Sequence, residues 1–239
     1  MAGELNVLCA GAVKGLVLAL QSGFERASGL RLHATFGAVG AMRDVLRSGA
    51  PCDVFIATDA MIGSLQASGE LRAATQRAIG RVQTAIAVKA SAPPPAIDSA
   101  ESLKAALLAC SAIYFPDATL STAGAHVAAI LERLAIRDAL ASRLRMFANG
   151  AIAMRELAGA DDAAIGCTQA TEIRYTPGLA LVGALPPPFA LATVYSAAVA
   201  AGARDDEGAR RFIDLVAGAS SADLRRAGGF DDVPARDDA

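Results

Sequence analysis

The feature that constrains this chain most is the alternation of short apolar segments with amphipathic helical patterns. Three apolar segments suited to strands occur early in the 239 residues, at 5–11, 30–36 and 53–57. After the first of them, Val13, Leu16 and Leu20 recur at helical spacing, and the two later segments are followed by similar patterns. Strands that alternate with helices in this way form an open, mostly parallel sheet with helices on both faces. The sequence therefore predicts an α/β fold.

The same pattern continues in the second half of the chain. An apolar segment at 81–90 leads into the proline-rich loop 92–95, near which we place a domain boundary. Further strands are expected at 112–115, 144–148, 163–167 and 179–185, and further helices at 99–109, 122–135, 151–158, 205–218 and 220–227. The acidic tail 231–239 is expected to fray.

A long apolar segment at 191–200 can run back into the first part of the chain. We therefore predict that residues 1–84 and 195–239 form lobe 1, and that residues 85–194 form lobe 2. Each lobe is expected to be a mostly parallel sheet flanked by helices, and two crossing strands join the lobes. Such a hinged architecture binds a ligand in the cleft between its lobes, where strand carboxyl ends and helix N-termini meet.

Composition excludes several classes of function. Hydrophobic residues make up 54% of the chain and charged residues 19%, so the chain can bury a substantial core. A net charge of −2 argues against a nucleic-acid partner, and no apolar run is long enough for direct membrane insertion. Four widely spaced cysteines and two histidines offer no metal-ligand spacing, and no nucleotide-binding fingerprint is present. We expect neither a metal nor a cofactor.

The N-terminal segment bears on localisation. Residues 5–13 are apolar like the centre of a secretory signal, but Glu4 stands where a signal would carry Lys or Arg. As written, the chain is therefore expected to be cytoplasmic. It is expected to be periplasmic if a leader has been removed.

Four strings carry a resemblance to a known family: LNVLCAGAVKGLV at the start, FGAVGAMRDVLRSGAPCDVFIATDA at 36–60, AIAVKASAP at 85–93 and VGALPPPFALATVYSAAVAAGA at 182–203. They resemble the molybdate-binding-protein-like group of extracellular solute-binding proteins, and the block SGAPCDVFIATDA is the most specific of them. The resemblance covers nearly the whole chain. It implies the two-lobed type 2 periplasmic-binding-protein fold and a small anionic ligand, a polycarboxylate or an oxyanion. For an exported protein it also implies the membrane components of an ABC-type transporter as partners.

The sequence departs from molybdate binders at informative positions. Such binders resemble one another in having serines in the first two loops after strands, where this chain has Ala12 and Ala38-Val39-Gly40. Where they tend to carry a tyrosine, this chain has Cys167-Thr168-Gln169. We therefore expect an organic acid rather than molybdate.

An enzyme remains an alternative to a carrier. A bacterial aconitate isomerase is similar to the same group, so the chain could be a cofactor-independent isomerase of a small polycarboxylate such as aconitate. A third possibility is a ligand sensor that contacts a partner protein. The sequence leaves open whether the chain is an enzyme.

The candidate ligand-binding positions lie where strands end and helices begin. Helix N-termini present unpaired N–H groups and partial positive charge, and small residues let a ligand approach the main chain. The junctions predicted to bind the ligand are Gly11 and Ala12; Ala38, Val39 and Gly40; Thr58; and Ser121 and Thr122. The alternative is that small residues here only make tight turns, and that the hydroxyls only cap helices.

Three further side chains complete the candidate site. Lys14 opposes the helix dipole in the first turn, so it either pairs with an anionic ligand or lies solvated on the outer face. Thr168 and Gln169 follow the expected strand 163–167, and a neutral amide there offers both a donor and an acceptor.

No catalytic residue can be assigned from the sequence. An isomerase needs a base beside the acidic carbon atom, and Lys14, Cys9, Asp59, Glu172 and Tyr195 are all possible. Glu172 also fits a simple role as an acid in the first turn of a helix. The cysteines are expected to act as small buried hydrophobes and His126 to be structural.

Overall fold

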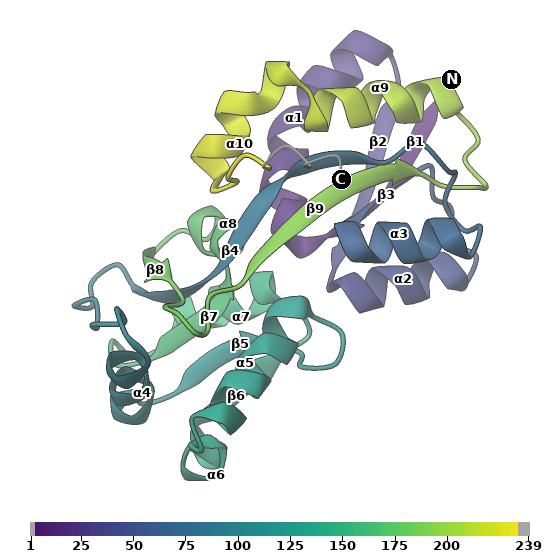
Figure 1. Ribbon diagram of the computed structural model, residues 1–239. Helices are drawn as coiled ribbons and strands as arrows, with labels where there is room; N and C mark the ends of the chain where they lie inside the picture. Colours follow the sequence, from purple (N-terminus) through teal and green to yellow (C-terminus); the bar gives the residue numbers. More distant parts are fainter. Residues whose placement is uncertain (1–2, 234–239) are drawn as a thin grey trace. The chain divides into compact units, whose positions relative to one another are not determined.

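A sheet of nine strands organises the described part of the molecule, residues 3–233 of the computed structural model (Figure 1). The strand order is β2-β1-β3-β9-β4-β7-β5-β6, and β8 pairs with β4 outside this path. Two compact units share these strands: the first contains residues 1–36, 42–82 and 193–239, and the second contains residues 37–41 and 83–192. The chain passes between units inside β4 and near the start of β9.

The first unit holds three strands and three helices from the N-terminal part of the chain, with the C-terminal helices packed on them. Its elements are β1 (Glu4–Ala10), η1 (Gly11–Val13), α1 (Lys14–Ser28), β2 (Arg31–Gly37), α2 (Val39–Arg47), β3 (Val54–Thr58), α3 (Asp59–Ala67), the start of β4 (Arg77–Lys89), most of β9 (Ala192–Val199), α9 (Asp206–Ala217), η3 (Ala219–Ser221) and α10 (Ala222–Gly228).

The central strands of the first unit are buried on both faces. β1 and β3 are parallel, with Val7 opposite Val54, and β9 runs antiparallel to β3. Figure 1 shows α2 and α3 on one face of these strands and α1 and α9 on the other, where Phe24 and Phe212 pack edge to face. Because helices cover both faces, β3 consists of a continuous buried run rather than an alternating one.

A buried aspartate ties the strands of the first unit together. Asp53 accepts hydrogen bonds from the backbone N–H of Asn6 at 2.7 Å and from that of Arg204 at 2.8 Å, and its side chain is 1% exposed. These bonds satisfy the carboxylate from β1 and from the segment after β9, so it is a structural group.

The second unit has the same alternation. Its elements are the end of β4, α4 (Ala100–Ala109), β5 (Ile113–Pro116), α5 (Thr122–Arg133), α6 (Arg137–Leu140), η2 (Ala141–Arg143), β6 (Leu144–Phe147), α7 (Gly150–Ala158), β7 (Ile165–Gln169), α8 (Ala170–Tyr175) and β8 (Leu179–Ala184). β5 is parallel to both β6 and β7, whereas β4 is antiparallel to β7 and β8.

The two faces of β7 contact different helices. Cys167 and its cross-strand neighbour Ile86 belong to the apolar core that α4 and α5 cover. Gly166 points to the other face, where a β-carbon would collide with Met154 and Leu157 of α7. Residues of β7 therefore alternate between an α5 side and an α7 side.

The structure moves some boundaries that the sequence suggested. The strand expected at 163–167 is β7 at Ile165–Gln169, so Thr168 and Gln169 lie within the strand, and α8 follows at once with Glu172 in its first turn, as the sequence suggested. The two compact units change over after 82 and 192, and residues 37–41 group with the second unit, while the lobe bounds 1–84, 195–239 and 85–194 stay a prediction.

The expected fraying does not apply to the first residue of the tail. Asp231 exchanges two backbone hydrogen bonds with Arg81 of β4, at 2.8 and 2.9 Å, so the chain is fixed to the sheet at that point. Residues 234–239 of the tail lie outside the described residues.

Candidate functional site

The carboxyl ends of β5, β6 and β7 lie at one edge of the second unit, because these strands are parallel. The helices α5 and α7 begin at this edge. The N–H of Asp117, just after β5, donates to the carbonyl oxygen of Phe147 at 2.7 Å, so the ends of β5 and β6 are joined. This edge is where an α/β unit of this kind places its ligand-binding groups.

The loop before α5 is organised by Asp117. One oxygen of its carboxylate accepts from the N–H and the hydroxyl of Thr119, both at 2.7 Å, and from the N–H of Leu120 at 2.8 Å. The hydrogen bond from the Thr119 hydroxyl lowers the pKa of Asp117 most, and the bonds from the N–H groups of Thr119 and Leu120 lower it further. Gly124 closes the packing, because a β-carbon there would overlap the carbonyl oxygens of residues 116 and 117.

Ser121 and Thr122 have different roles in this loop. The Ser121 side chain caps α5 by accepting from the N–H of Gly124 at 3.4 Å, which is the capping alternative considered for it. Thr122 is half-buried at the first position of α5, and its hydroxyl has no hydrogen bond among the described residues. Of the two, Thr122 has the hydroxyl left for a ligand.

A buried carboxylate lies at the N-terminus of α7. Asn149 caps this helix by accepting from the N–H of Ile152 at 2.9 Å. Glu172, on the first turn of α8, accepts from the hydroxyl of Thr168 at 2.5 Å, and both side chains pack so closely on Gly150 that a β-carbon there would overlap them. Thr168 is therefore engaged with Glu172, and its proposed contact with a ligand stays a prediction.

The Gln169 side chain, unlike that of Thr168, has no hydrogen-bond partner among residues 3–233, and the hydroxyl of Thr171 also has none. Gln169 is the N-cap residue of α8 but makes no capping hydrogen bond, and it is 3% exposed. Neither the nitrogen nor the oxygen of its amide has a hydrogen bond, and the same is true of the hydroxyl of Thr84, which lies opposite it on β4. Burying such a group without a hydrogen bond costs about 1–3 kcal/mol, so the unpaired Gln169 amide and Thr84 hydroxyl need an explanation.

In the first unit, β1 and β3 also end at one edge. Gly11 and Ala12 form the short helix η1 after β1, and Lys14 begins α1. The Lys14 ammonium lies 5.6 Å from the ring centroid of Phe36 at the end of β2. Lys14 is half-buried over this ring rather than solvated on an outer face, so its charge is held near the strand ends.

Thr58 and Asp59 form the junction after β3. Thr58 caps α3 by accepting from the N–H of Met61 at 3.3 Å, so its oxygen has a structural role. Asp59 accepts from the hydroxyl of the fully buried Ser196 on β9 at 2.7 Å and from the amide of Gln76. These contacts hold the Asp59 carboxylate in the first turn of α3.

The junction after β2 is occupied by protein contacts. Ala38 and Val39 are buried, and the N–H of Gly40 donates to the carbonyl oxygen of Leu120 at 2.9 Å. A β-carbon at Gly40 would press on the Leu120 backbone at 3.2 Å. The N–H of Gly40 therefore donates to Leu120, and the absence of a side chain at Gly40 lets the two backbones approach each other. Ligand contacts from Ala38, Val39 and Gly40 remain a prediction.

The cysteines are poorly suited to proton or group transfer. All four cysteines are buried, and burial raises the pKa of Cys9 and raises that of Cys167 to about 12. His126 contacts the carbonyl oxygen of Phe189 at 2.7 Å, which confirms a structural role. Over residues 3–233, no group of three or more His, Cys, Asp or Glu side chains could hold a metal ion.

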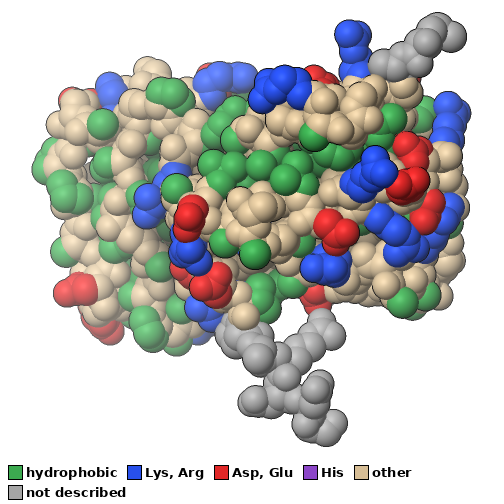
Figure 2. Space-filling view, turned by 90° about the horizontal axis from the view of Figure 1, so that it is seen from above, with side chains coloured by type: hydrophobic (Ala, Val, Ile, Leu, Met, Phe, Trp, Pro, Cys, Tyr) green, Lys and Arg blue, Asp and Glu red, His purple; other side chains and the backbone are tan. Residues whose placement is uncertain are grey.

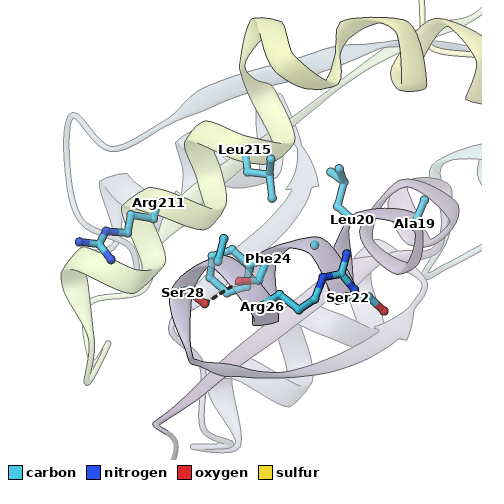
Figure 3. A pocket seen from close by; sticks show the side chains of 10 residues that line it. Ala19, Leu20, Ser22, Phe24, Arg26, Ser28, Arg211 and Leu215 are labelled. Carbon is cyan, nitrogen blue, oxygen red and sulfur yellow. Dashed lines mark hydrogen bonds between the residues drawn. The ribbon is translucent and has the colours of Figure 1, made fainter.

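The first unit also has a groove on its outer surface. The groove, of about 540 Å³, runs between α1 and α9, and Figure 3 shows Leu20 and Leu215 pointing into it with Phe24 at its floor. It begins several residues into α1, away from the strand ends. On the face displayed in Figure 2, basic and acidic side chains are interspersed with apolar ones. Within residues 3–233, no helix is both long and apolar enough to span a bilayer.

Sequence reasoning missed several polar residues at these edges. Thr84, Gln76 and Ser196 come from parts of the chain that carry no motif, and only strand pairing and packing bring them to Gln169 and Asp59. A polar residue inside an otherwise apolar strand was the one available signal, as in the VQTAIAV of β4 and the VYSAAV of β9.

Comparisons with known proteins agree with this arrangement. An aconitate isomerase from Pseudomonas sp is 26% identical over 241 residues, which cover 97% of this chain and 89% of that protein. The periplasmic molybdate-binding protein of Azotobacter vinelandii has the same fold, with a TM-score of 0.75, 18% identity and coverage of 95% of this chain and 98% of that one. The sulfate-binding protein SubI of Mycobacterium tuberculosis gives a TM-score of 0.76 at 14% identity, with coverage of 97% and 88%.

These similarities confirm the two-lobed α/β fold of periplasmic binding proteins that the sequence predicted. The family itself is identified by a match that spans almost the whole chain, residues 5–231. The strand-end edges described above therefore belong to a scaffold shared with solute carriers, and the chain is a member of the bacterial extracellular solute-binding protein family.

Proposed function

We propose that the protein binds a small organic anion, a polycarboxylate rather than molybdate, and that the strand-end edge of the second unit contacts this ligand. The observation that carries this proposal is the Gln169 side chain, buried and unpaired at the end of β7. An unpaired buried amide is unfavourable in the ligand-free protein, and a bound ligand supplies the missing hydrogen bonds. Membership in a solute-binding family supports the same conclusion.

The chemistry of the edges favours an organic acid. Ala12 and the Gly40 junction offer no hydroxyl, so a tetrahedral oxyanion would find few side-chain donors there. In the second unit, the Thr122 hydroxyl and the Gln169 amide offer two different neutral donors. Donors of different kinds suit the separate carboxylates of an organic acid better than one symmetric ion. In the first unit, Lys14 offers a positive charge.

The test is a binding panel read by calorimetry and thermal unfolding, with citrate, cis- and trans-aconitate, tricarballylate, sulfate and molybdate. We expect polycarboxylates to bind, and a ligand at about 100 times its dissociation constant to add about 2.7 kcal/mol of stability. Gln169→Leu should weaken that binding at least fivefold. The matched control is Gln66→Leu, whose amide donates to the Arg72 carbonyl oxygen at the far end of α3. Binding of molybdate or sulfate alone would refute the proposal.

A second candidate is isomerisation of a small polycarboxylate. It is favoured by the similarity to an aconitate isomerase along 97% of this chain. One route between cis- and trans-aconitate is an allylic shift, in which a base removes a proton from the CH2 group, the double bond moves by one carbon, and a proton is added at the former alkene carbon. Proton NMR of either isomer with the protein in deuterated buffer tests this candidate: conversion above the buffer rate establishes an enzyme, and binding without conversion removes aconitate as its substrate.

If the protein is exported, we propose that it delivers its ligand to the membrane components of an ABC-type transporter. The family membership supports this role.

A further inference from the structure

Three unpaired polar atoms are concentrated at one place in the second unit. They are the hydroxyl oxygen of Thr84 and both the nitrogen and the oxygen of the Gln169 amide. Thr84 on β4 and Gln169 on β7 are direct partners in the antiparallel pairing. Directly opposed residues project from the same face of a sheet with their β-carbons about 4.5–5.5 Å apart. The three atoms therefore form one polar cluster rather than three separate defects.

The cluster lies on the α5 side of the sheet, above apolar neighbours. Ile86 and Cys167 are two residues away on β4 and β7 and are also paired with each other, so they project from the same face. Both belong to the apolar core beneath α4 and α5. Thr168 and its partner Glu172 project from the opposite face, with Gly150 of α7. The core side chains around the cluster thus offer it no hydrogen bonds.

The two ends of the amide make different demands on a ligand. The Gln169 nitrogen donates, so any carboxylate or oxyanion can satisfy it. The Gln169 oxygen only accepts, and it is buried without a donor. A fully ionised ligand such as sulfate, molybdate or an ionised carboxylate brings only acceptors. It would bring a negative oxygen close to the buried amide oxygen and leave that oxygen unpaired.

We infer that the ligand carries a hydrogen-bond donor, either a hydroxyl group or a protonated carboxyl group, that binds the Gln169 oxygen while an ionised carboxylate of the same ligand takes the Gln169 nitrogen. This inference rests on the proposed function and narrows its substrate class. The Thr84 hydroxyl, which can donate and accept, completes the cluster by bonding to the same ligand group. The ligand class is then hydroxy acids, or polycarboxylic acids that bind with one proton.

Citrate and tricarballylate provide a matched pair for the test. They have the same three carboxylates on the same carbon chain and differ by one hydroxyl group. A site built to bond a hydroxyl strongly rejects the analogue that lacks it. If the donor is a hydroxyl, calorimetry at pH 7.5 should show citrate binding at least tenfold more tightly than tricarballylate. Gln169→Leu should reduce this preference to about twofold or less, whereas Gln66→Leu should retain it.

A protonated carboxyl is distinguished by proton uptake. In that case tricarballylate binds about as well as citrate, and its binding enthalpy differs between HEPES and Tris buffers by the amount that corresponds to uptake of about one proton. The uptake should disappear in Gln169→Leu. Equal affinities without proton uptake would overturn the inference while leaving the proposed function in place. Failure of every carboxylate to bind would overturn both.

Discussion

Replacing Gln169 by leucine should stabilise the ligand-free protein, although the same change removes a group proposed to bind ligand. The side chain is 3% exposed and neither amide atom has a hydrogen bond. Leucine has nearly the same volume and would place methyl groups above Ile86 and Cys167, which are apolar. The substitution removes the penalty of an unpaired buried amide, about 1–3 kcal/mol, and adds a little apolar burial.

The expected shift is large enough to measure. For a chain of this length, 1 kcal/mol corresponds to about 2–4 °C in the unfolding midpoint. We therefore expect the midpoint of Gln169→Leu to rise by at least about 2 °C in ligand-free buffer, by scanning calorimetry and by urea unfolding. Because a protein with two compact units need not unfold in one step, both methods should be fitted for each transition separately.

Thr84→Val provides an independent check of the same reasoning. Valine has the shape of threonine, and the hydroxyl that it replaces is fully buried and unpaired. Valine should therefore also raise the midpoint. A fall of the midpoint in both variants would refute the reasoning, because it would show that these polar groups are satisfied in the ligand-free protein. Loss of ligand binding together with a gain in stability is the result expected of residues kept for function.

Three further predictions concern packing, pH and thiol chemistry. Gly150→Ala should lower the unfolding midpoint by several degrees, because the added β-carbon would overlap Glu172 and Thr168. The control Gly63→Ala, in open space on α3, should raise the midpoint slightly. An unchanged midpoint in Gly150→Ala would show that Glu172 moves freely. Asp117→Ala should destabilise the protein near pH 7. Folding lowers the pKa of Asp117, so its ionised carboxylate stabilises the fold at pH values above its ordinary pKa of 3.8, and this stabilisation is lost as the pH falls further. The difference in unfolding midpoint between Asp117→Ala and the wild type should therefore shrink below about pH 4. A difference that does not change with pH contradicts this account. The four cysteines should resist Ellman's reagent at pH 8 until urea unfolds the chain, and fast labelling of Cys167 would contradict its burial.

The sequence by itself determined the fold class and most elements. A period of two or a continuous apolar run marks a strand, and a period of 3.6 marks a helix, so the alternation along the chain was readable without tertiary information. Helix starts were also readable from the sequence, because a capping residue bonds to a residue only a few positions further along the chain. Ser121 and Thr58 precede the helices that they cap and bond to residues three positions later.

Only the tertiary structure decided which of the candidate residues form hydrogen bonds within the protein. Gly40 and Thr168 looked equivalent to Gln169 in the sequence, but Leu120 and Glu172 bond to the first two, whereas no described residue bonds to the Gln169 side chain. The extent of the short helix α8 was also not readable, because six residues are too few to show a period, and Glu172 alone marked its first turn. Hydrogen bonds between distant segments depend on strand register and on how helices pack, and a shift of one residue would turn Gln169 to the other face of the sheet. Local patterns therefore predict where the edge of a sheet lies, whereas the pairing of distant strands decides which polar groups at that edge are left unpaired.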